Sequence, residues 1–171
     1  MVPPPRALLR VLLPILFLAI VAPAVAKPLS PGDRAPRFEF SNVQTGETMG
    51  FTDVTSTGPL LLVFLQTACR SCVREMVALK KVYAEVEGFG VLGVFLDVKP
   101  RGMEEYVADY ELPFTFTWDG SYATADAYGV SYSPTSFLVG SDGKVAAVYA
   151  GFTRGTEDDI RADLEKLLVR R

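Results

Sequence analysis

Apolar residues form two dense runs in the middle of the chain, at residues 60–65 and 91–96. Short, continuous apolar runs bounded by glycine and proline are typical of strands that are buried on both faces. Between the runs, apolar side chains recur at helical spacing, at Cys72, Met76, Leu79, Tyr83 and Val86. Two buried strands joined by a helix predict a right-handed βαβ unit with a parallel strand pair.

Weaker patterns predict further elements on either side of this unit. Before it, residues 38–40 alternate like a strand, and the turn Thr45-Gly46 would pair them with a second short strand at 48–51. After it, the pattern predicts helices at about 102–110 and 122–128, strands at 136–139 and 145–149, and a closing helix that Thr156 begins and caps. Asp142-Gly143 predicts a two-residue turn between the last two strands. Together these elements predict an α/β sandwich around a mixed sheet.

The first 26 residues have the composition of an export signal. Arg6 and Arg10 precede an apolar stretch, and Ala24-Val25-Ala26 supplies the small residues that a signal peptidase recognises. The alternative is an uncleaved membrane anchor, but the uncharged stretch contains two prolines and is shorter than the roughly 20 apolar residues of a spanning helix. We therefore predict a cleaved signal peptide at 1–26 and a protein that works in the periplasm or elsewhere outside the cytoplasm.

The remaining residues have the length of one ordinary domain, and no repeat or low-complexity linker divides them. We expect residues 27–35 to form a proline-containing segment that leads into a single domain at 36–171. The chain has a net charge of −3 and a pI near 5.0, which argues against a nucleic-acid partner. We expect the domain to be a monomer.

The chain contains only two cysteines, Cys69 and Cys72, with Arg70 and Ser71 between them. They follow the first apolar run and precede the helical pattern, so Cys69 should lie where the helix begins. There the free N–H groups and the positive end of the helix dipole favour a thiolate, and Arg70 adds a neighbouring cation. The spacing also places both side chains on one helical face, within reach of a short disulfide. This pattern indicates a redox site.

Several other chemistries are excluded by what the chain lacks. It has no histidine, so Ser-His and Cys-His catalysis and histidine-ligated metals are excluded. A c-type haem would need histidine after the second cysteine, where Val73 stands, and two thiols alone do not complete a structural zinc site. We expect neither cofactor nor metal. A purely structural disulfide across so short a step would close almost no loop and add little stability.

The order strand, CxxC, helix, strand, helix, Pro134-Thr135, hairpin, helix resembles the thioredoxin fold. The N-terminal hairpin, the signal sequence and the insertion before Pro134-Thr135 are similar to the TlpA/ResA-type extracytoplasmic thiol-disulfide oxidoreductases, within the redoxin or AhpC/TSA-like branch. The resemblance covers roughly residues 33–169. It implies a thioredoxin-like α/β fold, with a mixed central sheet flanked by helices and an N-terminal β-hairpin extension.

The resemblance also implies roles for particular residues. Cys69 matches the exposed nucleophile and Cys72 the buried resolving thiol, and the two would form the redox disulfide. Pro134 matches a cis-proline opposite that disulfide. Glu75 matches an acidic residue that several members place beside the thiols, and we expect it to exchange protons with Cys72. Substrate binding would involve Arg70, Ser71, Ser133, Pro134 and Thr135.

The sequence departs from the family pattern next to both cysteines. Ala68 stands where members usually have tryptophan, and Ser71 stands where many have proline. Simpler interpretations also remain for single residues. Glu75 could be a solvated helix carboxylate, Arg70 could be surface decoration, and Asp97 is expected to be a solvated acid at a strand end. Three aromatic residues are expected to pack in the core or at its rim, namely Phe114, Phe116 and Trp118.

Three functional classes are compatible with these observations. The first is an extracytoplasmic oxidoreductase that reduces protein disulfides, as in cytochrome c maturation, and receives electrons from a membrane thiol donor of the CcdA/DsbD type. The second is a peroxiredoxin-like peroxidase, whose signature would need proline at Leu62 and threonine or serine at Gln66. The third is a Cu(I) carrier, because soft thiolates bind that ion. The family resemblance favours the first.

Overall fold

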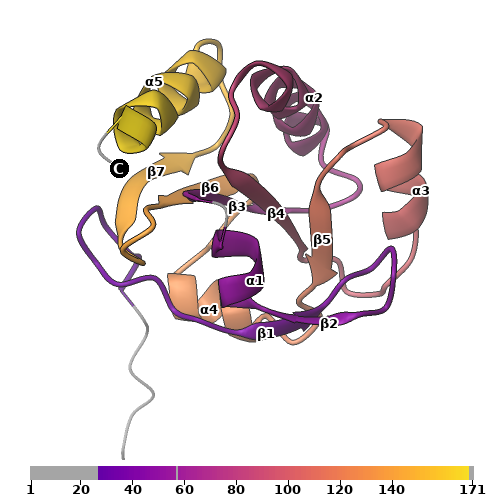
Figure 1. Cartoon of the computed structure of the whole chain (residues 1–171). Helices are drawn as coiled ribbons and strands as arrows, with labels where there is room; N and C mark the ends of the chain where they lie inside the picture. Colours follow the sequence, from indigo (N-terminus) through magenta and orange to yellow (C-terminus); the bar gives the residue numbers. More distant parts are fainter. Residues whose placement is uncertain (1–26, 57, 170–171) are drawn as a thin grey trace, which may run out of the picture.

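A five-stranded mixed sheet forms the centre of the computed structural model, which describes residues 27–56 and 58–169 (Figure 1). The strand order is β5-β4-β3-β6-β7. β3 (Leu60–Leu65) lies in the middle, parallel to β4 (Gly90–Phe95) and antiparallel to β6 (Thr135–Val139). β5 (Thr115–Trp118) and β7 (Val145–Ala150) are the outer strands. The predicted βαβ unit and mixed sheet are confirmed.

Helices cover both faces of this sheet (Figure 1). One core layer contains buried residues of α2 (Arg70–Glu85), α3 (Met103–Asp109) and α5 (Thr156–Val169). The other contains buried residues of α1 (Phe51–Thr55) and α4 (Ala123–Tyr128). β3 connects the two layers, because its odd-numbered leucine and valine residues pack into the first and its even-numbered residues into the second. A strand with every side chain buried therefore supports the helix that carries the cysteines.

The N-terminal segments pack on the edges of the domain. β1 (Glu39–Ser41) and β2 (Thr48–Gly50) form the predicted antiparallel hairpin, and the Val43 N–H donates to the carbonyl of Phe116 at 2.9 Å. This contact covers part of the open edge of β5. Farther upstream, the Ala35 N–H donates to the Gly143 carbonyl at 3.0 Å. The segment at 27–35 is thus attached to the β6–β7 hairpin.

Four details differ from the sequence-based expectations. Residues 115–118 form strand β5, which the sequence pattern does not predict. Phe114 and Phe116 are buried in the core as expected. The expected strand at 48–51 ends at Gly50, and Phe51 begins α1 instead. The β6–β7 turn is longer than two residues, since the strands end at Val139 and resume at Val145. Thr156 does begin α5, but its hydroxyl accepts from the N–H of Thr153, outside the helix.

The predicted signal peptide, residues 1–26, lies outside the described residues. Within residues 27–56 and 58–169, no helix is long and apolar enough to cross a membrane.

Candidate active site

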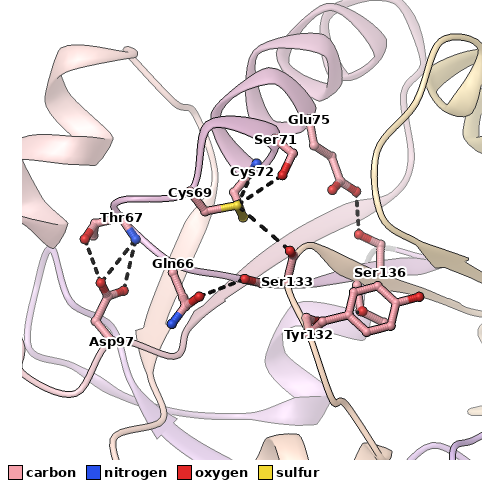
Figure 2. Close-up of a disulfide and its surroundings, with 11 residues drawn as sticks. Gln66, Thr67, Cys69, Ser71, Cys72, Glu75, Asp97, Tyr132, Ser133 and Ser136 are labelled. Carbon is pink, nitrogen blue, oxygen red and sulfur yellow. Dashed lines mark hydrogen bonds between the residues drawn. A yellow bond between two sulfur atoms is a disulfide. The ribbon is translucent and has the colours of Figure 1, made fainter.

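The two cysteines lie where the central strand passes into α2 (Figure 2). They form a disulfide with a Cα–Cα distance of 5.2 Å. Cys69 is the N-cap residue of α2 and is half-buried, whereas Cys72, one turn into the helix, has no exposed surface. The two sulfurs are therefore inequivalent: a substrate can approach the first, and the second is reached only through the protein.

The Cys69 sulfur accepts hydrogen bonds from two residues in the first turn of α2. The Cys72 N–H donates to it at 3.1 Å, and the Ser71 hydroxyl lies 3.3 Å away and must be the donor, because a disulfide sulfur carries no proton. This sulfur also lies at the positive end of a 16-residue helix. All three features favour negative charge on the sulfur, so they would stabilise a Cys69 thiolate after reduction.

A loop before β6 faces the disulfide (Figure 2). The Ser133–Pro134 peptide bond is cis, which confirms the geometry that the family resemblance predicts. The Ser133 carbonyl oxygen lies 4.0 Å from the Cys69 sulfur, and the Ser133 hydroxyl donates to Oε1 of Gln66 at 3.0 Å. The Thr135 hydroxyl donates to the carbonyl of Tyr132 at 2.8 Å. The Gln66 side chain after β3 and the hydrogen bond within the loop before β6 thus hold Ser133 next to the Cys69 sulfur.

Asp97 holds the loop that precedes the cysteines. Its carboxylate accepts from the Thr67 hydroxyl at 2.6 Å and from the Thr67 N–H at 3.1 and 3.2 Å. The backbone carbonyl of Asp97 in turn accepts from the indole N–H of Trp118 at 2.8 Å. The expectation of a solvated strand-end acid is therefore wrong, because the parallel pairing of β3 and β4 brings Asp97 beside Thr67.

Glu75 is buried on the inner face of α2, with a relative exposure of 1%. Its Oε1 accepts a hydrogen bond from the hydroxyl of Ser136, and Oε2 has no hydrogen-bond partner among the described residues. Burial raises the pKa of Glu75 from 4.5 to about 7, and the Ser136 hydrogen bond partly opposes that rise. The alternative interpretation of Glu75 as a solvated surface acid is therefore wrong.

Arg70, which was expected beside the nucleophile, lies at the surface of the site. Arg70 is exposed at the first position of α2 and forms no ion pair with any described residue. Sequence reasoning missed Gln66, Thr67 and Ser136. Nothing local in the sequence marks Ser136, which follows the hydroxyl residues Ser133 and Thr135 and is brought opposite Val63 only by the antiparallel pairing of β3 and β6.

The two sulfurs are the reactive atoms of this site. Among residues 27–56 and 58–169, no three His, Cys, Asp or Glu side chains cluster in a way that could hold a metal ion. The sulfurs that could ligate a soft ion are joined to each other in this structure. What the geometry does provide is a reversible two-electron couple with one accessible sulfur.

A CxxC disulfide at the N-terminus of the helix after the central strand, opposite a cis-proline loop, defines a thioredoxin-like disulfide-exchange protein. Residues 31–148 match the AhpC/TSA family. The chain belongs to this family. It is a thiol-disulfide oxidoreductase of the ResA-like type.

Individual relatives agree with this assignment. The thiol-disulfide oxidoreductase ResA of Geobacillus thermodenitrificans is 30% identical over 138 residues, which cover 80% of this chain and 77% of the relative. A protein from Chlorobium tepidum, assigned as the thiol:disulfide interchange protein DsbE, superposes with a TM-score of 0.75 at 29% identity, covering 82% of this chain and 99% of that one. The peroxidoxin BcpB of Mycobacterium tuberculosis (TM-score 0.69, 23% identity, 80% and 97% coverage) shares the fold alone. The predicted thioredoxin-like fold is confirmed.

Proposed function

We propose that this protein is an extracytoplasmic reductant of protein disulfides. The observation that carries the proposal is the asymmetry of the cysteine pair. Cys69 is reachable and surrounded by groups that favour its thiolate, whereas Cys72 is completely buried one turn away. A nucleophile at the surface and a protected resolving thiol are what sequential disulfide exchange requires.

The reaction follows from this asymmetry in two balanced steps. The Cys69 thiolate attacks one sulfur of a substrate disulfide, which breaks the substrate S–S bond, forms a mixed disulfide and releases one substrate thiolate that takes up a proton. Cys72 then loses its proton and attacks the Cys69 sulfur, which releases the second substrate thiolate. The substrate gains two electrons, and the protein ends with the Cys69–Cys72 disulfide seen in this structure.

Glu75 supplies a proton acceptor for the second step. Burial raises the pKa of a thiol, so Cys72 needs a base to react near neutral pH. Glu75 lies one turn farther along the same buried face of α2, and its own pKa of about 7 lets it both accept and return a proton there. The direct or water-mediated transfer would leave the Glu75 carboxyl protonated after resolution.

The substrate would bind as an extended segment across the cis-proline loop. The Ser133 backbone next to the Cys69 sulfur offers a carbonyl for strand-like pairing, with Pro134 and Thr135 completing that edge. Arg70 and Ser71 would contact the same segment from the start of α2. This binding mode places the substrate sulfur in line with Cys69.

A reductant outside the cytoplasm needs a source of electrons. We propose that residues 1–26 direct export and are cleaved, leaving a segment at 27–35 and one monomeric domain at 36–171. A membrane thiol donor of the CcdA/DsbD type would then re-reduce the Cys69–Cys72 disulfide. Disulfides of apocytochromes in cytochrome c maturation are the substrates that the ResA resemblance favours.

N-terminal sequencing of the protein isolated from cells tests the proposed cleavage. The sequence should begin at Lys27, and an intact Met1 would contradict export by cleavage.

A trapping experiment tests the proposed exchange. The reduced Cys72→Ser variant, mixed with a protein that carries one accessible disulfide, should accumulate a mixed disulfide through Cys69, detected by mass spectrometry. Cys69→Ser is the matched control and should accumulate none, because Cys72 is buried. Adducts formed equally by both variants, or by neither, would contradict the proposal.

A further inference from the structure

A groove of about 480 Å³ opens beside the start of α2. Four residues line it: Arg70, Val73, Arg74 and Tyr110. We call this feature the arginine groove. Because Arg70 directly follows Cys69, the groove begins next to the sulfur that a substrate must reach. Its walls combine two cations with apolar and aromatic surface.

Neither arginine of the groove is paired with a carboxylate among the described residues. Neither forms an ion pair there, although both are exposed. By contrast, Lys80 farther along α2 is paired with Glu111. The whole chain carries a net charge of −3. A pair of uncompensated arginines beside the disulfide is therefore a local positive patch on an acidic protein.

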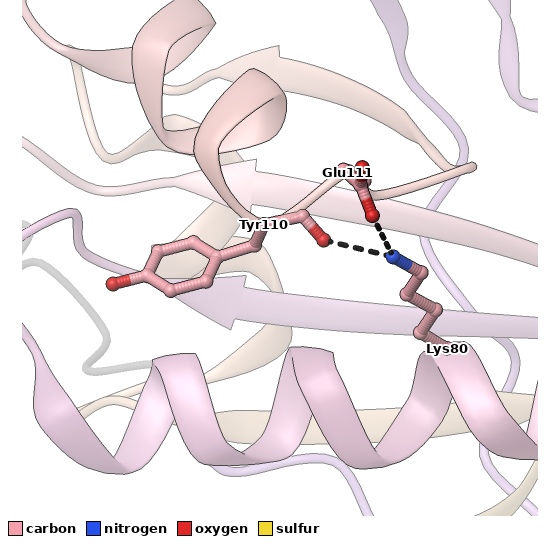
Figure 3. Close-up of polar contacts among 3 residues, drawn as sticks. All are labelled: Lys80, Tyr110 and Glu111. Carbon is pink, nitrogen blue, oxygen red and sulfur yellow. Dashed lines mark hydrogen bonds and ion pairs between the residues drawn. The ribbon is translucent and has the colours of Figure 1, made fainter.

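The tyrosine wall of the groove is fixed in place by contacts between α2 and α3. The Lys80 ammonium group donates to the backbone carbonyl of Tyr110 at 3.2 Å and to the Glu111 carboxylate at 3.0 Å. Figure 3 shows the Tyr110 ring lying over α2 and extending away from Lys80. The ring also packs edge-on against the Tyr106 ring, with centroids 5.1 Å apart. The groove is thus largely formed before any ligand binds.

We propose that the arginine groove binds an acidic segment next to the cysteine of the substrate protein. This inference rests on the proposed function, and it names the sequence that the site would recognise. Arg70 and Arg74 are one turn apart, about 6 Å along the helix. Alternate residues of an extended chain are about 6.6 Å apart and point to the same side. Two carboxylates in an acid-x-acid pattern would therefore match the two arginines, while an apolar side chain two positions before or after them, on the same side of the segment, packs against Val73 and Tyr110.

Three peptides of equal length, each with one disulfide, test this specificity. Their cysteine is flanked by Glu-x-Glu, Gln-x-Gln or Lys-x-Lys, and the reduced full-length protein is mixed with each in a stopped-flow instrument. The Glu-x-Glu peptide should react fastest, and the Arg74→Gln variant should lose about two- to fivefold of its advantage over Gln-x-Gln. Raising the salt to about 1 M should shrink the advantage in the wild-type protein, because the Debye length falls to about 3 Å.

Lys81→Gln is the matched control, since Lys81 is an exposed cation on the same helix but does not line the groove. This variant should keep the preference of the wild-type protein. Equal rates for the three peptides, or equal losses in Arg74→Gln and Lys81→Gln, would overturn recognition by the groove while leaving disulfide reduction intact. If none of the peptides is reduced, the proposed function itself fails.

Discussion

Replacing Glu75 by glutamine should change how the stability of the oxidised protein depends on pH. The carboxyl group has an ordinary pKa of 4.5 and a pKa of about 7 in the folded protein, because it is buried. Below pH 4.5 both the folded and the unfolded state keep the proton. Between these two values the unfolded state releases the proton first, so the free energy of unfolding falls as the pH rises. Well above pH 7 Glu75 is ionised in both states, and the free energy of unfolding falls no further.

The size of this effect follows from the shift. A pKa difference of this size corresponds to about 3 kcal/mol of stability lost between pH 4 and pH 8. Glutamine cannot ionise, so the variant lacks this loss, whatever constant cost its amide group adds at all pH values. The variant should therefore gain about 3 kcal/mol relative to the wild type on going from pH 4 to pH 8.

Urea unfolding of the disulfide-bonded protein at a series of pH values measures this difference, with both thiols kept from titrating by the disulfide. Glu87→Gln is a suitable control, because Glu87 is exposed just beyond α2. It should give a curve nearly parallel to that of the wild type. If the curves of Glu75→Gln and the wild type are also parallel, the Glu75 pKa is not raised by burial, and its role as a proton acceptor at neutral pH loses its basis.

Three further substitutions test separate parts of the structure. Ser136→Ala removes the hydrogen bond that favours the ionised form of Glu75, so it should cost about 1–3 kcal/mol at pH 8 and less at pH 5 in urea unfolding; equal costs would contradict the coupling. Asp97→Ala leaves the Thr67 N–H without its acceptor and should make that amide exchange faster by NMR, whereas unchanged exchange would refute the anchoring role. Gly93→Ala places a methyl group against an aromatic ring of β5 and should lower stability by about 1–3 kcal/mol; an unchanged urea midpoint would contradict the close packing.

The parts of the fold that were predicted correctly depend on local patterns. The six apolar residues of β3, the cysteine spacing and the helical stripe of α2 are each visible within a short window. α1 was missed because its threonine and valine residues are poor helix formers, and it depends on tertiary packing of Phe51, which is 4% exposed. β5 was missed because its alternation is only four residues long and is completed by pairing with β4.

The site shows the same division between local and long-range information. The inequivalence of Cys69 and Cys72 follows from their order along one helix, so it could be predicted. The Glu75–Ser136 hydrogen bond joins residues 61 positions apart, and it exists only because β6 pairs with β3. The same holds for Asp97, whose contact with Thr67 requires the register between β3 and β4. Sequence patterns therefore locate the sulfur chemistry, and the sheet determines which side chains support it.

A protein that gives electrons to disulfides needs a low reduction potential, so the potential of the Cys69–Cys72 pair decides whether this protein is a reductant. Two effects act on the potential in opposite directions: hydrogen bonds and the helix dipole stabilise a Cys69 thiolate and raise it, whereas burial of Cys72 one turn from the Glu75 carboxyl group disfavours negative charge there and lowers it. The proposed direction of electron flow requires the second effect to prevail. The potential can be measured by equilibrating the protein with defined dithiothreitol ratios and counting free thiols by mass spectrometry after alkylation. We expect a value nearer the roughly −270 mV of thioredoxin, and a value near the roughly −120 mV of the oxidant DsbA would contradict a reductant role.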